Sequence, residues 1–189
     1  MFWLICLIFL AVFKNFYLYW INRSGSTKFM EKKIIKKFGN QLRVRVCGVL
    51  VEDNRILLVK HKSLGTQGIL WAPPGGGMQF GSSASENLIR EFEEETGLKI
   101  KIRHFLFIHE FLNPPLHAIE LFFDVERVGG ILRTGSDPEV EEDDQIIEKV
   151  AFVNFHDLGQ MERLQIHQAL RECRSYEEII QKKGYIKIK

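Results

Sequence analysis

Four charged residues in one short stretch of the chain have the types and spacing to bind a cation. Residues 90–95 read Arg-Glu-Phe-Glu-Glu-Glu, which places Glu91, Glu94 and Glu95 within four residues of one another. On a helix, side chains three and four residues apart share a face, with Cβ atoms roughly 5–6 Å apart. Such carboxylates repel one another, and a hard divalent cation such as Mg²⁺ prefers oxygen ligands of this kind. We therefore predict a metal site on a helix that carries Glu91, Glu94 and Glu95.

A run of prolines and glycines precedes this stretch. Pro73 and Pro74 are followed directly by Gly75, Gly76 and Gly77, a pattern that predicts an irregular turn. Glycine lets a backbone curl and approach a ligand closely, where a side chain would obstruct it. We therefore expect the three glycines to bind substrate.

The helix itself has clear start and stop signals. Ser83 and Glu86 have the S-x-x-E form of a capping box, so the helix is predicted to begin near Ser83. Gly97 is placed to end it. Its buried side is expected to consist of Leu88, Ile89 and Phe92.

The rest of the domain reads as strands with one further helix. Asp53-Asn54 is expected to form the turn of a hairpin. Apolar residues at helical spacing predict the second helix over residues 162–174. Strands are expected at residues 43–52, 55–61, 99–111, 117–127, 146–154 and, at the end of the chain, 184–189. Several strands with two helices predict an α/β fold with a mixed β-sheet flanked by helices.

At this point the sequence resembles the Nudix hydrolase family. The Nudix box has the form G-x5-E-x7-R-E-U-x-E-E-x-G-U, where U is a bulky apolar residue. Gly76 occupies its first place, Arg90 to Leu98 fill its last nine places, and residues 71–76 match the W-x-x-P-G-G sequence that precedes the box in many members. The resemblance implies an α/β/α sandwich around a mixed β-sheet, and it extends more loosely over residues 41–158.

The resemblance also implies an activity and roles for individual residues. It implies a Mg²⁺-dependent hydrolase, with Mn²⁺ as a substitute, that cleaves the diphosphate linkage of a small nucleoside diphosphate derivative. Glu91, Glu94 and Glu95 are expected to bind the metal, Glu91 or a downstream acid to act as general base, and Arg90 to orient a carboxylate. Because many members are dimers, a homodimer is also expected.

The downstream acid is expected in an acidic loop. In many members a glutamate from a later loop completes the metal site. Residues 137–144 are rich in Asp and Glu, and we choose Glu142 as this fourth metal ligand. Glu120, on the preceding strand, is the alternative.

One position departs from the family pattern. Eight residues before Arg90 the box has Glu, and this chain has Ser82. In the family that Glu helps to hold metal and pairs with the box arginine, and loss of such a supporting group typically costs about 10–100-fold in metal affinity or activity. Glu86, four residues before Arg90, could pair with it instead. The alternative function is a Nudix-fold nucleotide-binding or sensor module with weakened or lost hydrolysis.

Composition excludes some classes of protein. The chain has 189 residues and a formal net charge of +2, with no long basic stripe, so we expect no nucleic-acid polymer as partner. Its three cysteines, Cys6, Cys47 and Cys173, form no CxxC pair, which favours a reducing, cytoplasmic setting. The six histidines show no HxxxH or HExxH spacing, so none of them is proposed as a metal ligand.

The segment before the domain has a different character. Met1 to Ile21 is almost wholly apolar, interrupted only by Lys14 and Asn15. It is long enough to span a bilayer, for which about 20 residues suffice, and the basic residues after it would leave the domain on the cytoplasmic side. Alternatively, the start codon is assigned too early and Met30 is the true start. The expected division is therefore an apolar segment, 1–29, and a Nudix domain, 30–189.

Overall fold

The structure is a computed structural model that describes residues 35–65, 67–136 and 145–187. Two four-stranded β-sheets form its centre. Both the apolar segment 1–29 and the acidic loop 137–144 lie outside the described residues, so the predictions made for them stay predictions. No helix among the described residues is long and apolar enough to cross a membrane.

The larger sheet is mixed, with strand order β1-β6-β5-β8. Its centre is a long antiparallel hairpin of β5 (Leu98–Asn113) and β6 (Leu116–Gly130). The strands β1 (Gln41–Val49) and β8 (Gly184–Lys187) extend it in parallel on either side. This sheet confirms the predicted mixed topology.

The smaller sheet is antiparallel and is built around β3 (Arg55–Lys62). This strand pairs with β2 (Val51–Glu52), β4 (Ile69–Ala72) and β7 (Ile147–Asn154). The strand predicted over residues 43–52 therefore divides into β1 and β2 and contributes to both sheets. The turn predicted at Asp53-Asn54 is present, and both residues have positive φ, as a two-residue hairpin turn requires.

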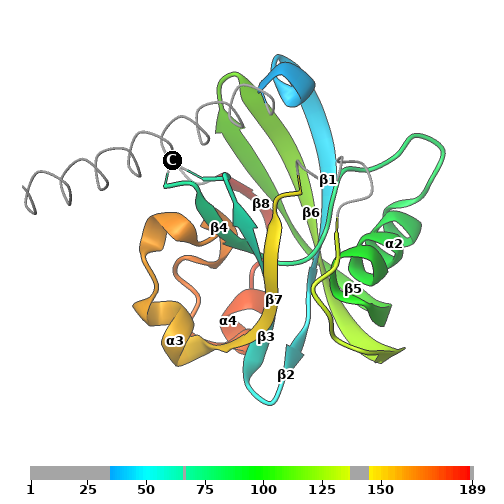
Figure 1. The fold of residues 1–189 in the computed structure, drawn as a ribbon, viewed down its shortest axis with the longest axis vertical. Helices are drawn as coiled ribbons and strands as arrows, with labels where there is room; N and C mark the ends of the chain where they lie inside the picture. The colour runs from blue at the N-terminus through cyan, green and yellow to red at the C-terminus, as the bar shows by residue number, and fades with distance from the viewer. Residues whose placement is uncertain (1–34, 66, 137–144, 188–189) are drawn as a thin grey trace, which may run out of the picture.

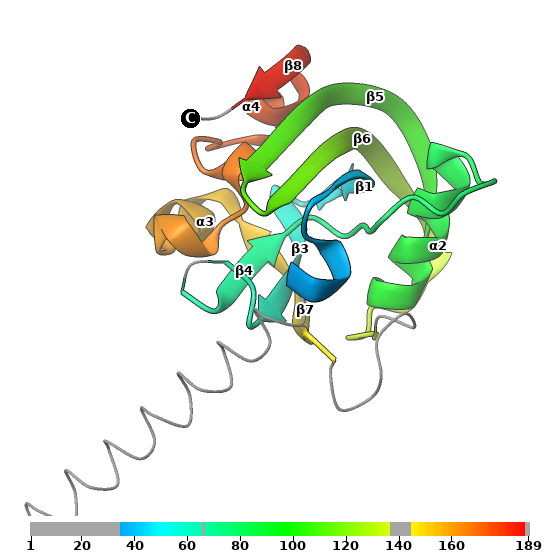
Figure 2. The ribbon, with the colours of Figure 1, turned by 90° about the horizontal axis from the view of Figure 1, so that it is seen from above.

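Helices lie on both sides of the sheets, as the predicted α/β/α sandwich requires (Figures 1 and 2). On one side α2 (Ala84–Thr96) packs Leu88 and Phe92 into a core shared with the strands. On the other side lie the short helices α3 (Phe155–Gln160) and α4 (Tyr176–Ile180), which belong to a second core. The large β5–β6 hairpin curves between these two layers (Figure 2).

The helix α2 begins and ends as its sequence predicts. The Ser83 side chain accepts a hydrogen bond from the backbone N–H of Glu86, and the Glu86 carboxylate accepts one from the backbone N–H of Ser83. Gly97 ends the helix in the left-handed conformation, and its N–H donates to the carbonyl of Glu93. Of the expected buried side, Leu88 and Phe92 are fully buried and Ile89 is 40% exposed.

The helix predicted over residues 162–174 is wrong. The segment forms two short 3-10 helices, η2 (Arg163–Gln165) and η3 (Gln168–Leu170). Between them Ile166 forms a parallel bridge with Trp71, and the His167 N–H donates to the Trp71 carbonyl at 2.9 Å. These tertiary contacts hold the backbone extended where a helix would need it coiled. The apolar spacing reflected burial, since Ile166, Ala169 and Leu170 are all buried.

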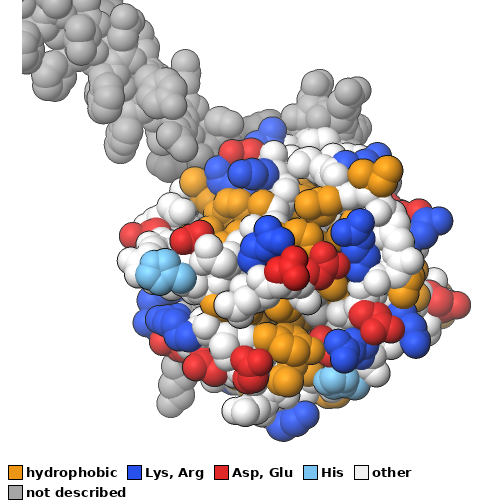
Figure 3. Space-filling model, turned by 90° about the horizontal axis from the view of Figure 1, so that it is seen from below, with side chains coloured by type: hydrophobic (Ala, Val, Ile, Leu, Met, Phe, Trp, Pro, Cys, Tyr) orange, Lys and Arg blue, Asp and Glu red, His pale blue; other side chains and the backbone are white. Residues whose placement is uncertain are grey.

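The surface of the domain mixes both signs of charge. Figure 3 shows one face on which hydrophobic side chains lie between separate groups of basic and acidic side chains. This pattern agrees with the nearly balanced charge of the sequence, which has 26 basic and 24 acidic residues.

Candidate active site

The glycine turn is held by backbone pairing with strand β1. The Val46 N–H donates to the Gly76 carbonyl at 3.0 Å, and the Gly48 N–H donates to the Pro74 carbonyl at 2.9 Å. Gly77 forms an antiparallel bridge with Arg45. The turn therefore runs beside β1 and is fixed relative to the sheet.

Two of the three predicted glycines touch the carboxylates of α2. The Gly75 N–H donates to Glu95 Oε2 at 2.9 Å, and φ of Gly75 is +150°. A Cβ on Gly76 would lie 2.3 Å from the carboxyl carbon of Glu91, so the turn backbone is in close contact with that carboxylate. At Gly77 the nearest atom to an added Cβ is a guanidinium nitrogen of Arg43 at 3.2 Å. Of these three positions, close contacts therefore require glycine only at Gly75 and Gly76.

We call Glu91, Glu94 and Glu95 the helix carboxylates. Arg90 joins two of them, because its guanidinium donates to Glu91 Oε1 at 2.6 Å and to Glu94 Oε2 at 2.7 Å. Glu91 and Glu95 are only 8% and 5% exposed. The structure thus joins Glu91 and Glu94 directly through Arg90, and it joins Glu91 and Glu95 through the glycine turn.

The electrostatics of the helix carboxylates favour a bound cation. Burial, together with the negative charges of Glu95 and Glu94, raises the pKa of Glu91 to about 7 despite the attraction of Arg90. One arginine therefore does not neutralise the group. An all-oxygen donor set with excess negative charge fits a hard divalent cation such as Mg²⁺.

A histidine from the smaller sheet lies next to this group. His61, on β3, points Nε2 toward Glu95 Oε1 at 4.0 Å. Its Nδ1 lies 3.3 Å from the Leu70 carbonyl, which accepts a hydrogen bond from this nitrogen when it carries the proton. The two sheets therefore both reach the helix carboxylates, β1 through the glycine turn and β3 through His61.

The expected replacement for the missing box glutamate is not formed. The Glu86 carboxylate accepts hydrogen bonds from the Ser83 N–H at 2.8 Å and the Ser83 hydroxyl at 2.7 Å, and these bonds lower its pKa. Arg90 instead bonds to Glu91 and Glu94. Glu86 is thus used as the helix cap, and it does not take the role of the glutamate that Ser82 replaces.

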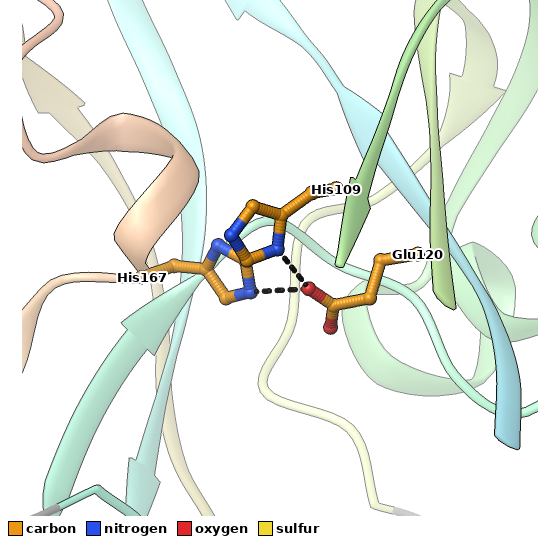
Figure 4. A group of neighbouring side chains, drawn as sticks. All are labelled: His109, Glu120 and His167. Carbon is orange, nitrogen blue, oxygen red and sulfur yellow. Dashed lines mark hydrogen bonds and ion pairs between the residues drawn. The ribbon is translucent and has the colours of Figure 1, made fainter. Parts of the chain in front are cut away.

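Of the two candidates for the downstream acid, the structure describes only Glu120. Its Oε2 lies 2.8 Å from His109 Nδ1 and 3.0 Å from His167 Nε2 (Figure 4). We call these three residues the buried histidine cluster, because they are 0–8% exposed. The three side chains converge from β5, from β6 and from the residue directly before η3, with both imidazoles directed at one carboxylate oxygen (Figure 4).

Sequence spacing missed this cluster because the residues come from separate elements. Nothing in the sequence aligned His167 with a strand, since a helix was expected there. The pair of His109 and Glu120 did leave a signal: these residues lie opposite each other in the β5–β6 hairpin. Pairing the two predicted strands across their short turn would have found it.

The distances among the three side chains would allow a bound metal ion, because their ligand atoms lie within 4.8 Å of one another. The backbone around His167 opposes this. The Ala169 N–H donates to His167 Nδ1 at 3.3 Å, so the imidazole proton is on Nε2 and points at Glu120. A neutral histidine ligates a metal through a nitrogen without a proton. We therefore interpret the cluster as a hydrogen-bonded network.

An α/β/α sandwich with a glycine turn against a helix that carries clustered carboxylates is the arrangement expected of a Nudix hydrolase. Comparison with known proteins agrees. The family model described as NUDIX domain matches residues 39–173. The chain therefore belongs to the Nudix hydrolase family, which confirms the resemblance and the fold class.

Individual relatives show the same relationship. An ADP-ribose pyrophosphatase from Methanocaldococcus jannaschii is 34% identical over 133 residues, covering 68% of this chain and 78% of the relative. Among solved structures, the MutT NUDIX hydrolase from Burkholderia pseudomallei is 24% identical with a TM-score of 0.57, covering 69% of this chain and 94% of that one. An ADP-ribose pyrophosphatase from Streptococcus suis is 16% identical with a TM-score of 0.52, covering 76% and 98%. These structural likenesses concern the fold.

Proposed function

We propose that this Nudix hydrolase is Mg²⁺-dependent and splits the diphosphate linkage of a nucleoside diphosphate derivative. The products would be a nucleoside monophosphate and a phosphorylated remainder. The observation that carries this proposal is the group of helix carboxylates, two of them buried, held by Arg90 and by the glycine turn. Mn²⁺ would substitute, because it accepts similar oxygen ligands.

The reaction is a hydrolysis in which a water oxygen forms a bond to one phosphorus atom. The bond from that phosphorus to the bridging oxygen breaks, and the bridging oxygen leaves with the other phosphate. A carboxylate that acts as general base, Glu91 or the downstream acid, would accept the proton that the water loses. Bound Mg²⁺ would neutralise phosphate oxygens and lower the pKa of a bound water. Glu91, Glu94 and Glu95 would hold the cation, with Glu142 as a fourth ligand, while the glycine turn would admit the diphosphate close to the backbone.

ADP-ribose is the first substrate to test. The relative with 34% identity is named an ADP-ribose pyrophosphatase, and it matches most of the length of both chains. Purified protein should release AMP from ADP-ribose in the presence of Mg²⁺. A panel of nucleoside triphosphates, dinucleoside polyphosphates and sugar nucleotides, with identification of products, would define the range of substrates.

The second candidate is a binding or sensor module. It is favoured by Ser82, because Glu86 does not replace the missing box glutamate. A protein that binds nucleotides but hydrolyses none with Mg²⁺ or Mn²⁺ would establish this function and overturn the hydrolase proposal.

The cellular setting is part of the same proposal. Cys47 and Cys173 are both buried and unpaired, which supports a reducing cytoplasmic compartment. We also propose a homodimer, which a measurement of molar mass in solution would test.

A further inference from the structure

We propose that Arg45 binds the diphosphate of the substrate, and that the buried histidine cluster holds it in position through Glu120. This inference rests on the proposed function, because it assigns a residue to the substrate's diphosphate. Arg45 would be a substrate-binding residue and Glu120 a positioning residue. Neither residue belongs to the Nudix box.

Arg45 lies between the glycine turn and the buried histidine cluster. In β1 it forms the backbone bridge with Gly77 on one side, and it lies opposite Glu120 of β6 on the other. Burial lowers its pKa, but the negative charges of Glu120, Glu95 and Glu91 outweigh this effect and raise it. Its bridge partner Gly77 directly follows Gly76, whose backbone contacts the Glu91 carboxylate, so Arg45 lies on the strand next to the helix carboxylates.

The contacts of Arg45 leave its guanidinium well placed to bind an anion. Its Nε lies 3.4 Å from Glu120 Oε1, yet this buried nitrogen has no hydrogen-bond acceptor among the described residues. The side chain is 28% exposed, whereas that of Glu120 is only 7% exposed. The ion pair with Glu120 therefore holds the buried end of the arginine without a hydrogen bond, and part of the side chain reaches solvent.

The buried histidine cluster explains why Glu120 can serve as this anchor. Burial alone would raise the pKa of Glu120, but its interactions with His167, His109 and Arg45 lower it well below its usual range. The carboxylate therefore stays ionised in the interior. Two imidazoles fix one of its oxygens, and the other faces Arg45.

A diphosphate is the ligand that this arrangement suits. A planar guanidinium binds phosphate through paired N–H donors, and this bidentate geometry gives specificity as well as affinity. The helix carboxylates would repel a bare diphosphate, so a cation on them and an arginine on the opposite side neutralise it together. Arg43 and Arg45 both lie beside the glycine turn, and Arg45 is the one that pairs with the buried carboxylate of Glu120.

The test measures affinity without turnover. Binding of α,β-methylene-ADP, whose diphosphate is not hydrolysed, is measured by titration calorimetry with saturating Mg²⁺. We expect Arg45→Gln to raise Kd by about 10–100-fold, as loss of a charged hydrogen bond does, and Arg45→Lys to recover part of the loss. The affinity for adenosine, which has no phosphate, should stay within about threefold, since no charged contact is lost there.

The matched control is Arg127→Gln. It removes the same charge from β6, where Arg127 pairs with the surface carboxylate of Glu52 at 3.7 Å. Equal affinity of wild type and Arg45→Gln for the analogue would overturn the role of Arg45, as would wild type that binds no analogue. Wild type that binds the analogue but hydrolyses no substrate would overturn the hydrolase proposal alone.

The role of Glu120 is tested by a double-mutant cycle. If Glu120 acts through Arg45, Glu120→Gln weakens analogue binding in wild type but not in Arg45→Gln. Additive losses would show that Glu120 acts independently. Should Glu120→Gln not fold, Glu120→Asp takes its place in the cycle. Stoichiometric Zn²⁺ binding that His167→Asn abolishes would show a metal site instead of an anchor.

Discussion

The helix carboxylates and the buried histidine cluster both centre on buried glutamates, yet these glutamates have opposite electrostatics. The pKa of Glu91 is raised to about 7, because burial and neighbouring carboxylates outweigh Arg90. The pKa of Glu120 is lowered despite burial, because two imidazoles and Arg45 surround it. The helix carboxylates therefore lack neutralising positive charge, whereas Glu120 has a cation and hydrogen-bond donors around it.

This difference distinguishes a ligand-binding site, the helix carboxylates, from a group that positions other residues, the buried histidine cluster. A group of like charges that its neighbours do not neutralise lowers stability until a ligand completes it, and such groups are typical of functional sites. A carboxylate whose partners are all supplied by the chain gains stability without a ligand. We therefore expect changes in the helix carboxylates to abolish activity, and changes in the buried histidine cluster to act on stability and on the position of Arg45.

The largest expected effect is that of Glu94→Gln. Loss of a charged metal ligand should lower kcat with Mg²⁺ by about 10³-fold, the equivalent of about 4 kcal/mol in the barrier. The matched control is Glu93→Gln, because Glu93 is on the same helix but pairs at the surface with Lys99 at 3.9 Å. Equal losses in both variants, measured as product release from the active substrate, would argue against a metal site on this face.

A second comparison concerns neighbouring glycines. Gly76→Ala would place a Cβ within 2.3 Å of the Glu91 carboxyl group, so that carboxylate must move. We expect activity to fall by about 100-fold, since small displacements of catalytic groups cost this much. Gly77→Ala meets only a flexible arginine end at 3.2 Å and should retain most activity. If both variants kept full activity, the close contact between Gly76 and Glu91 would have no functional meaning.

A third comparison uses stability in EDTA. Because the pKa of folded Glu91 is about 7 and its ordinary value is 4.5, its contribution to stability is fully present below pH 4.5 and is lost as pH rises through 7. Glu91→Gln should therefore raise the free energy of unfolding at pH 8 by about 1–3 kcal/mol. Its activity should nevertheless be lost, since the amide is a poor metal ligand.

The opposite sign is expected at Glu120. Its pKa is lowered in the folded state, so its contribution is present above the ordinary carboxyl pKa and is lost as pH falls. Glu120→Gln should lower the free energy of unfolding at pH 8 by about 2–3 kcal/mol, as loss of charged hydrogen bonds does. Urea titrations of both variants at pH 5 and pH 8 measure these effects. Shifts of the same sign would remove the contrast between the two groups.

Local signals in the sequence predicted most of the fold and the helix carboxylates. The capping box at Ser83 and the glycine at Gly97 determine the ends of α2 through neighbouring residues alone. The spacing of the glutamates along the chain therefore predicted which of them share a face of this helix. The helix predicted over residues 162–174 failed because pairing of His167 with Trp71 overrides local spacing. Arg45 and His167 acquire their roles only when distant strands and turns come together.

The smallest expected effect is that of Ser82→Glu, which restores the acid that the family pattern has at this place. The Glu86 carboxylate already accepts hydrogen bonds from Ser83 and does not replace the missing glutamate. A carboxylate at position 82 would therefore add an interaction that Glu86 does not make. We expect metal affinity or activity to rise by about 10-fold, the lower end of what such supporting groups contribute. Ser85→Glu, which adds the same charge at an exposed position of the first turn, is the control. A gain with Ser85→Glu equal to that with Ser82→Glu would show that added negative charge near the helix start matters and that its position does not. A gain with Ser82→Glu alone would show that the helix carboxylates lack one specific partner, whereas Glu120 already has two imidazoles and Arg45 next to it.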